Sequence, residues 1–178
     1  MLLAMLIANS VALAGDWHDL PKPDQSDWST KRIANFEKFR GMGVPQAVIR
    51  VPSKGVEAAV YPDTLPGSLE AGVAWVTSTP RPGSPGNVAI AGHRDSFFRK
   101  LEGISKGTRI DLQTESAVLV FEVESVAIVD PLDTSPLAQT PEDVLTLITC
   151  HPFYYKGYAP DRYIVRATRV QSSTAAAE

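Results

Sequence analysis

Short apolar segments separated by turn-forming residues recur along most of this chain, and this pattern constrains the fold more than any other feature. The chain has 14 prolines and 12 glycines, which favour short strands with frequent turns over a helical bundle. The strand-like segments are 48–51, 56–61, 72–76, 87–91, 109–112, 118–128, 145–149 and 163–170. Eight short strands with few helices predict a mostly β fold, a closed or nearly closed β-barrel.

One helix is expected ahead of the strands. Residues 28–40 carry Ile33, Phe36 and Phe39 at near-helical spacing, which predicts a short amphipathic N-terminal helix. A short connecting helix of one or two turns is also expected at residues 97–101.

These segments divide the chain into a barrel and its flanks. We expect residues 16–45 to form a polar linker followed by the N-terminal helix, and residues 46–170 to form the barrel domain. Residues 171–178 are expected to be a disordered tail.

The first 15 residues form an apolar stretch of a different composition. It is shorter than the roughly 20 residues that cross a bilayer, and no Lys or Arg precedes the apolar run. Three interpretations stay open: a signal peptide, part of a membrane anchor, or a stray apolar terminus. We expect one of the first two, and therefore an exported protein.

Charge argues against nucleic acid as a partner. The chain has 17 basic and 20 acidic residues, a net charge of −3, and no basic run. At 178 residues with 44% hydrophobic residues, it is long enough for one domain with a substantial core.

Cys150 is the only cysteine, and it ends the apolar run 144–150. A lone thiol cannot form an internal disulfide or a four-cysteine metal site, so Cys150 is either an inert core residue or a nucleophile. No zinc-ligand spacing and no phosphate-cradling glycine loop occur, so we expect neither a metal nor a cofactor.

Two other segments favour the nucleophile. Residues 87–94 form an apolar strand that leads to His93, and residues 159–166 contain a strand with Arg162 near its start. A thiol, an imidazole and a guanidinium on three strands make a plausible acyl-transfer site. In such a site Cys150 attacks, His93 moves the proton, and Arg162 stabilises the oxyanion or holds the peptide.

Other residues compete for these roles. His151 directly follows the cysteine, but neighbouring side chains on a strand point to opposite faces, so we expect His151 to face away. The alternative interpretation of Arg162 is an ordinary surface arginine without a catalytic role. Arg166 is the control for that alternative.

Three motifs together resemble those of the sortase family. Residues 85–94, with the sequence PGNVAIAGHR, resemble the sortase histidine motif, residues 146–150 fit the TLxTC signature, and Arg162 fits the family's arginine. The resemblance runs from about residue 48 to residue 170, and residues 130–131 and 153–157 look most like class D sortases and their Gram-negative relatives.

This resemblance implies an eight-stranded sortase barrel and a membrane-anchored cysteine transpeptidase that works outside the cytoplasm. The implied substrate is a secreted protein with a C-terminal sorting signal of the LPxTG type. The implied acceptor is an amine on a peptidoglycan stem or a protein lysine. A Leu-Pro motif requires an apolar groove. The candidate groove residues are Ala91, Pro131, Leu132, Leu137, Thr149, Phe153 and Tyr155.

Two alternatives to a transpeptidase remain at this stage. The same residues would serve a plain cysteine peptidase, because water or an amine is selected only in the second half-reaction. An exported β-barrel binding module with a vestigial site is a third interpretation, although such a site would often have lost one of the three residues.

Overall fold

Eight strands form the body of the protein in a computed structural model that describes residues 20–170. The predicted signal or anchor segment (1–15) and the predicted tail (171–178) lie outside the described residues. The strands are β1 (Ala47–Val51), β2 (Val56–Tyr61), β3 (Val73–Trp75), β4 (Asn87–Ala91), β5 (Arg109–Thr114), β6 (Val118–Val129), β7 (Val144–His151) and β8 (Asp161–Arg169). The helices are α1 (Thr30–Phe39) and α2 (Pro66–Ala71), with 3₁₀ turns η1 (Pro52–Lys54), η2 (Arg99–Leu101) and η3 (Ser135–Leu137).

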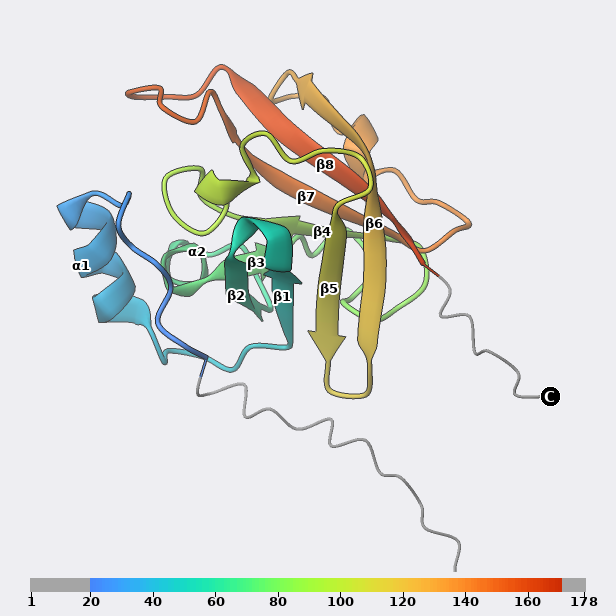
Figure 1. Cartoon of the computed structure of the whole chain (residues 1–178), viewed down its shortest axis with the longest axis horizontal. Helices are drawn as coiled ribbons and strands as arrows, with labels where there is room; N and C mark the ends of the chain where they lie inside the picture. The colour runs from blue at the N-terminus through green and yellow to red at the C-terminus, as the bar shows by residue number, and fades with distance from the viewer. Residues whose placement is uncertain (1–19, 171–178) are drawn as a thin grey trace, which may run out of the picture.

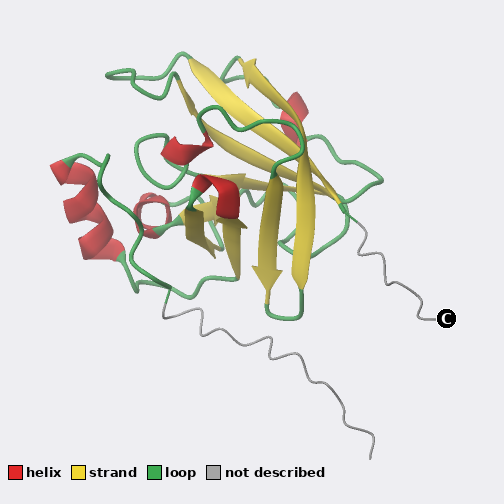
Figure 2. Cartoon of the chain, in the orientation of Figure 1, coloured by secondary structure: helices red, strands yellow, loops and turns green. Residues whose placement is uncertain are grey.

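The strands close into a barrel in the order β1-β2-β3-β4-β7-β8-β6-β5 (Figure 1). The pairs β2–β3 and β4–β7 are parallel, and the other pairs are antiparallel. Figure 2 shows that helix contributes little beside the strands. The prediction of a mostly β, eight-stranded barrel with an N-terminal helix and short connecting helices is therefore confirmed.

The barrel interior is filled by alternate side chains of each strand. On β4 these are Val88 and Ile90, on β7 Leu145 and Leu147, and on β8 Val165, all of which are buried. Burying one such side chain stabilises the fold by about 1.5–3 kcal/mol, which makes the alternation a strong determinant of register. The intervening residues of these strands therefore face outward.

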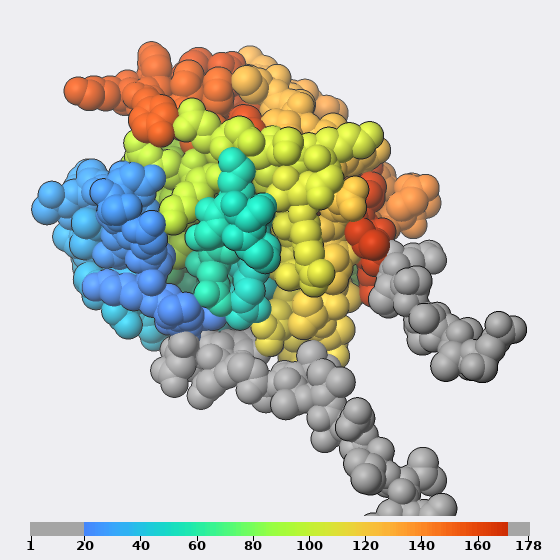
Figure 3. Space-filling model, viewed as in Figure 1, coloured from blue at the N-terminus to red at the C-terminus, as the bar shows by residue number. Residues whose placement is uncertain are grey.

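Helix α1 lies against one side of the barrel (Figure 3). It begins after Ser29, whose hydroxyl accepts a hydrogen bond from the Arg32 backbone N–H at 3.2 Å, as expected of an N-cap. Trp28, Phe36 and Phe97 pack edge to face with ring centroids 5.0–5.9 Å apart. This aromatic cluster joins the helix to the segment that follows β4.

The elements differ from the predicted ones mainly in helix α2 and in the bounds of some strands. No individual helix is predicted at residues 66–71; in the structure Pro66 occupies the first turn of α2, where a missing N–H costs nothing. Strand β8 begins at Asp161, two residues earlier than predicted. Within residues 20–170, no helix has the length and apolar character needed to cross a membrane.

Candidate active site

The strand pairing brings Cys150 and Arg162 side by side. Cys150 is the register partner of Arg162 in the antiparallel pair β7–β8, so their two side chains share one face. Since Leu147 and Val165 point into the barrel, alternation turns Cys150 and Arg162 to its outer surface.

His93 reaches the same place from the other side of β7. In the parallel pair β4–β7, Ala91 is the partner of Ile148, and the Gly92 N–H donates to the Ile148 carbonyl oxygen at 3.0 Å. Two residues beyond this pair, His93 follows the end of β4 and Cys150 lies near the end of β7. The strand that carries the Cys150 thiol therefore lies between the segments that carry His93 and Arg162.

Gly92 fits this arrangement for a steric reason. A β-carbon at Gly92 would lie 2.7 Å from a ring carbon of Phe98 and 2.9 Å from a methyl carbon of Val73. Thr149 provides a second constraint, because its buried hydroxyl donates to the Gly92 carbonyl oxygen at 2.7 Å. Thr149 thus fastens the histidine segment to the cysteine strand, and it lies on the opposite face of β7 from the thiol.

The three predicted residues line one open cleft of about 700 Å³. Its walls come from α1, the segment after β4, and the loop 152–160 between β7 and β8, which Figure 1 shows projecting from the barrel on the side of α1. The lining residues are Ser29, Arg32, His93, Arg94, Asp95, Arg99, Cys150, Phe153, Tyr154, Tyr155, Lys156, Gly157, Tyr158, Ala159 and Arg162.

The surroundings of His93 are strongly charged. Its Nε2 lies 3.8 Å from Oε1 of Glu70, which is beyond hydrogen-bonding distance. Burial is the main reason that the pKa of His93 lies below its ordinary value; the Arg32 guanidinium lowers this pKa further, while Glu70 and Asp95 act in the opposite direction. The free protein therefore holds His93 mainly as neutral imidazole at neutral pH.

The Arg162 guanidinium faces backbone oxygens and has no carboxylate partner within residues 20–170. Its Nη1 donates to the carbonyl oxygen of Asp161 at 3.0 Å and lies 3.5 Å from that of Ala159. By contrast, Nε of Arg166 lies 3.2 Å from a carboxylate oxygen of Glu124. Arg162 therefore keeps donors available for a negatively charged or carbonyl group in the cleft.

His151 points to the other side of its strand. The ring stacks on Tyr163 at 6.0 Å between centroids, meets Phe153 edge-on at the same distance, and has Nδ1 3.9 Å from Oδ2 of Asp161. It does not line the cleft, so it has a packing role in this structure.

The loop 152–160 is fastened beside the site by Arg94. Its guanidinium donates to the carbonyl oxygens of Pro152, Tyr155 and Gly157 at 3.2, 2.9 and 2.8 Å. Tyr155, a predicted groove residue, is exposed and lies over the Arg94 guanidinium at 5.9 Å. Phe153, another predicted groove residue, also lines the cleft, but most of its ring is buried against Tyr163.

The remaining predicted groove residues spread over a larger area. Ala91 lies on the outer face beside Ile148, close to the cleft. Pro131 and Leu132 lie two and three residues after the Val129–Arg162 pair, but they do not line the cleft, and Leu132 is 88% exposed. Leu137 is farther away in the same loop, in η3.

The position of Leu137 follows from its neighbours. The buried Asn87 side chain donates to the carbonyl oxygens of Pro136 and Ala138 at 2.8 and 2.9 Å. Asn87 begins β4, whereas His93 follows its end, so η3 and Leu137 lie a strand's length from the thiol. The cleft around Cys150 does not include Leu137.

Three charged residues of the cleft region escaped the sequence analysis. Arg32 of α1 contacts Glu70 of α2 and Asp95 of the segment after β4, and all three surround His93. Only Asp95 carried a local signal, because it follows two residues after the predicted histidine. The contacts of Arg32 and Glu70 depend on how both helices pack, which no local pattern records.

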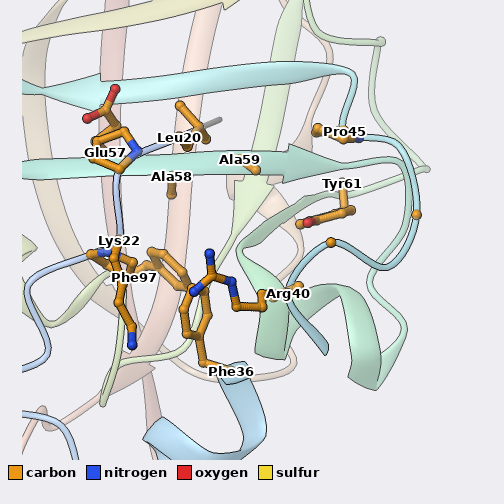
Figure 4. Close-up of a pocket in the computed structure, with 15 residues that line it drawn as sticks. Leu20, Lys22, Phe36, Arg40, Pro45, Glu57, Ala58, Ala59, Tyr61 and Phe97 are labelled. Carbon is orange, nitrogen blue, oxygen red and sulfur yellow. The ribbon is translucent and has the colours of Figure 1, made fainter. Parts of the chain in front are cut away.

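The described residues form no metal site, and a separate cavity lies away from the cleft. Among the described residues, no group of three or more His, Cys, Asp or Glu side chains could hold a metal ion. A small cavity of about 100 Å³ lies between the N-terminal segment, α1 and β2, where the rings of Phe36 and Phe97 line one side (Figure 4). It contains none of the predicted site residues.

Comparisons with known proteins agree on one family. The Sortase family model, described as the sortase domain, matches residues 49–170. Sortase D of Bacillus subtilis is 32% identical over 144 residues, which cover 80% of this chain and 73% of that protein.

Solved structures give the same result. The Sortase D5 transpeptidase of Clostridium perfringens matches with a TM-score of 0.65 and 26% identity, covering 82% of this chain and 91% of that one. Sortase A of Corynebacterium diphtheriae matches with a TM-score of 0.68 and 25% identity, covering 89% and 80%. This chain therefore belongs to the sortase family, whose members are cysteine transpeptidases.

Proposed function

We propose that this sortase cleaves an LPxTG-like sorting signal through a thioacyl-enzyme on Cys150 and transfers the acyl group to an amine at the cell surface. The observation that carries this proposal is the strand register, in which Cys150 pairs with Arg162 on the outer face while His93 follows the neighbouring parallel strand. All three side chains line one cleft that is open to a peptide.

In the first half-reaction, the Cys150 thiolate attacks the carbonyl carbon of the scissile peptide bond. Arg162 donates hydrogen bonds to the oxyanion of the tetrahedral intermediate, since its guanidinium has no carboxylate to neutralise it within the described residues. The carbon–nitrogen bond then breaks, and the protonated form of His93 gives its proton to the leaving amine. The products are a thioester on Cys150 and the C-terminal fragment of the substrate.

In the second half-reaction, the acceptor amine attacks the thioester. Neutral His93 takes the proton that the amine loses, the carbon–sulfur bond breaks, and the thiolate of Cys150 is restored. His93 thus needs both protonation states within one cycle. A pKa held below its ordinary value by burial and Arg32 favours the neutral state, in which His93 accepts the proton of the acceptor amine while the thioester is present.

The peptide itself would lie along the outer face that leads to the thiol. Ala91 and Ile148 pair there, and Ile164 is the partner of Ile148 on the next strand, so this surface is apolar. Leucine and proline side chains bind such a surface by packing rather than by charge. The loop 130–143 begins beside Arg162 and returns to β7, and it would border this groove.

The proposal extends to where the protein acts and on what. We propose an exported enzyme, with the catalytic domain on the outer side of the membrane and an anchor or signal in residues 1–15. Its substrate would be a secreted protein that ends in a sorting signal. The acceptor would be a peptidoglycan stem amine or a protein lysine.

The deciding experiment compares an amine with water as acceptor. Incubating the protein with an LPxTG-type peptide should give slow hydrolysis, and adding a glycine peptide, a diaminopimelate-type stem or a lysine peptide should divert the product to an amide. Mass spectrometry separates the acid from the amide. Efficient hydrolysis with none of these amines ever incorporated would instead make the protein a cysteine peptidase on a sortase barrel.

We expect Arg162→Lys to lose most activity although it keeps the positive charge. Lysine cannot reproduce the planar fork of donors, and losing one oxyanion donor costs on the order of 10²–10³ in rate. Steady-state cleavage of the same peptide measures the loss.

Arg166→Lys is the matched control, because Arg166 lies on the same strand and the same outer face but pairs with Glu124 outside the cleft. Arg166→Lys should cleave the peptide at nearly the parent rate. Near-normal turnover by Arg162→Lys would mean that only charge matters at this position, or that Arg162 is structural.

A further inference from the structure

A charged cluster joins the N-terminal helix to the histidine. Arg32 Nη1 donates to Oε2 of Glu70 at 2.5 Å, and Arg32 Nη2 donates to both carboxylate oxygens of Asp95 at 2.9 and 3.1 Å. The side chains of Arg32 and Glu70 are only 14% and 15% exposed. One guanidinium therefore binds two carboxylates that come from different segments.

The same two carboxylates are close to the His93 imidazole. Oε1 of Glu70 lies 3.8 Å from Nε2 of His93, while the other oxygen of that carboxylate is held by Arg32. A Glu70 side chain without Arg32 would be free to approach the ring and form a direct ion pair with its protonated state. Arg32 thus holds the carboxylate near the ring and short of hydrogen-bonding distance.

Anchoring of α1 does not rest on this cluster alone. The helix is already held by the aromatic packing of Trp28, Phe36 and Phe97. Buried ion pairs contribute little net stability, since the cost of desolvating the charges offsets their attraction. A structural role alone therefore gives no reason for the cluster to lie against the histidine.

We propose that Arg32 is a positioning residue for His93: it holds Glu70 beside the imidazole and cancels negative charge that Glu70 and Asp95 would otherwise present to the ring. This inference rests on the proposed function of His93. In that reaction His93 must release its proton and later accept another. Two uncompensated carboxylates would bind the imidazolium too firmly for that exchange, and Arg32 prevents this.

Charged and titratable groups that line the cleft or lie beside His93 define its electrostatic field. They come from every element around it and are Arg32 of α1, Glu70 of α2, Arg94 and Asp95 after β4, Arg99 of η2, Cys150 of β7, Tyr154, Tyr155, Lys156 and Tyr158 of the loop 152–160, and Arg162 of β8. Of the charged groups, Arg32, Glu70 and Asp95 have a resolved effect on the pKa of His93. The two main variants of the test therefore change members of this cluster.

The experiment is a proton NMR titration of the His93 ring in the free protein. The chain has only three histidines, and the spectrum of His93→Gln identifies the relevant signal. Arg32→Met should move the His93 titration midpoint to higher pH, because it removes a positive charge and releases two carboxylates. Glu70→Gln should move the midpoint to lower pH, because it removes a negative charge without changing size.

Two control variants sharpen the result. Arg40→Met removes an arginine at the end of the same helix, where it pairs with Glu37 at 3.4 Å, and it should leave the midpoint unchanged. Arg32→Lys keeps the positive charge and should stay closer to the parent protein than Arg32→Met. A purely structural role would not move the two main variants in opposite directions.

The outcomes separate this inference from the proposed function. An unchanged or lowered midpoint in Arg32→Met, or an unchanged or raised one in Glu70→Gln, overturns the role of Arg32. Should Arg32→Met fail to fold, the Glu70→Gln titration decides alone. The titration needs no substrate, so opposite shifts in a protein that never forms an acyl-enzyme would reject the proposed reaction and leave the positioning contact intact.

Discussion

Replacing Cys150 with alanine should abolish peptide cleavage, lowering turnover on the order of 10⁴-fold or more. The physical reason is that no second thiol is available to form the thioester, since the chain has one cysteine and it lines the cleft. The thioester adduct should disappear as well. Intact-protein mass spectrometry with a sorting peptide detects it directly.

The same substitution should leave the fold almost unchanged. Cys150 is partly exposed on the outer face, so alanine removes little buried surface, and the thermal midpoint should stay close to that of the parent protein. A thiol reagent provides the companion measurement, because it can label only one position in the parent chain. Persistent turnover by a folded Cys150→Ala protein would reject the thioacyl mechanism.

Replacing His93 with alanine should be the second most damaging change, with an expected loss of about 10²–10⁴-fold. Among residues 20–170 no other histidine lines the cleft, so without His93 neither the leaving amine nor the acceptor amine would have its proton carrier. The loss should appear in single-turnover formation of the acyl-enzyme as well as in its transfer to an amine.

His151→Ala is the matched control, one residue from the thiol on the other face of β7. It should keep most activity and instead lower the unfolding free energy by about 1 kcal/mol, because His151 packs on the rings of Tyr163 and Phe153. Measuring rate and denaturant midpoint for both variants separates chemistry from packing. A reversed ranking of the two rates would mean that His151 moves the proton.

The barrel and the three candidate residues were predictable because their signals are local. Each strand is a short apolar run between turn residues, and Cys150, His93 and Arg162 lie at or near strand ends inside recognisable motifs. Alternation along β7 also indicated the direction of His151, because a period of two needs no tertiary information.

What escaped prediction depends on packing between distant segments. The position of Leu137, a predicted groove residue, is one example: the path of its loop is set by the Asn87 side chain, which donates to two carbonyl oxygens of the turn and holds Leu137 away from the cleft around Cys150. Arg32 and Glu70 look like ordinary surface charges in the sequence. Their contacts exist only because α1 and α2 meet beside the end of β4.

The contacts of Arg94 determine which residues beside the cleft can be changed without moving the loop. It holds the loop 152–160 through three backbone carbonyl oxygens, and none of these contacts depends on which side chain the loop carries. Tyr154, Tyr155 and Tyr158, which are exposed on this loop, can therefore be exchanged without removing the clamp. A library randomised at these three positions would vary the rim of the cleft while the reacting groups stay in place, which makes the loop a natural starting point for engineering new ligation specificities.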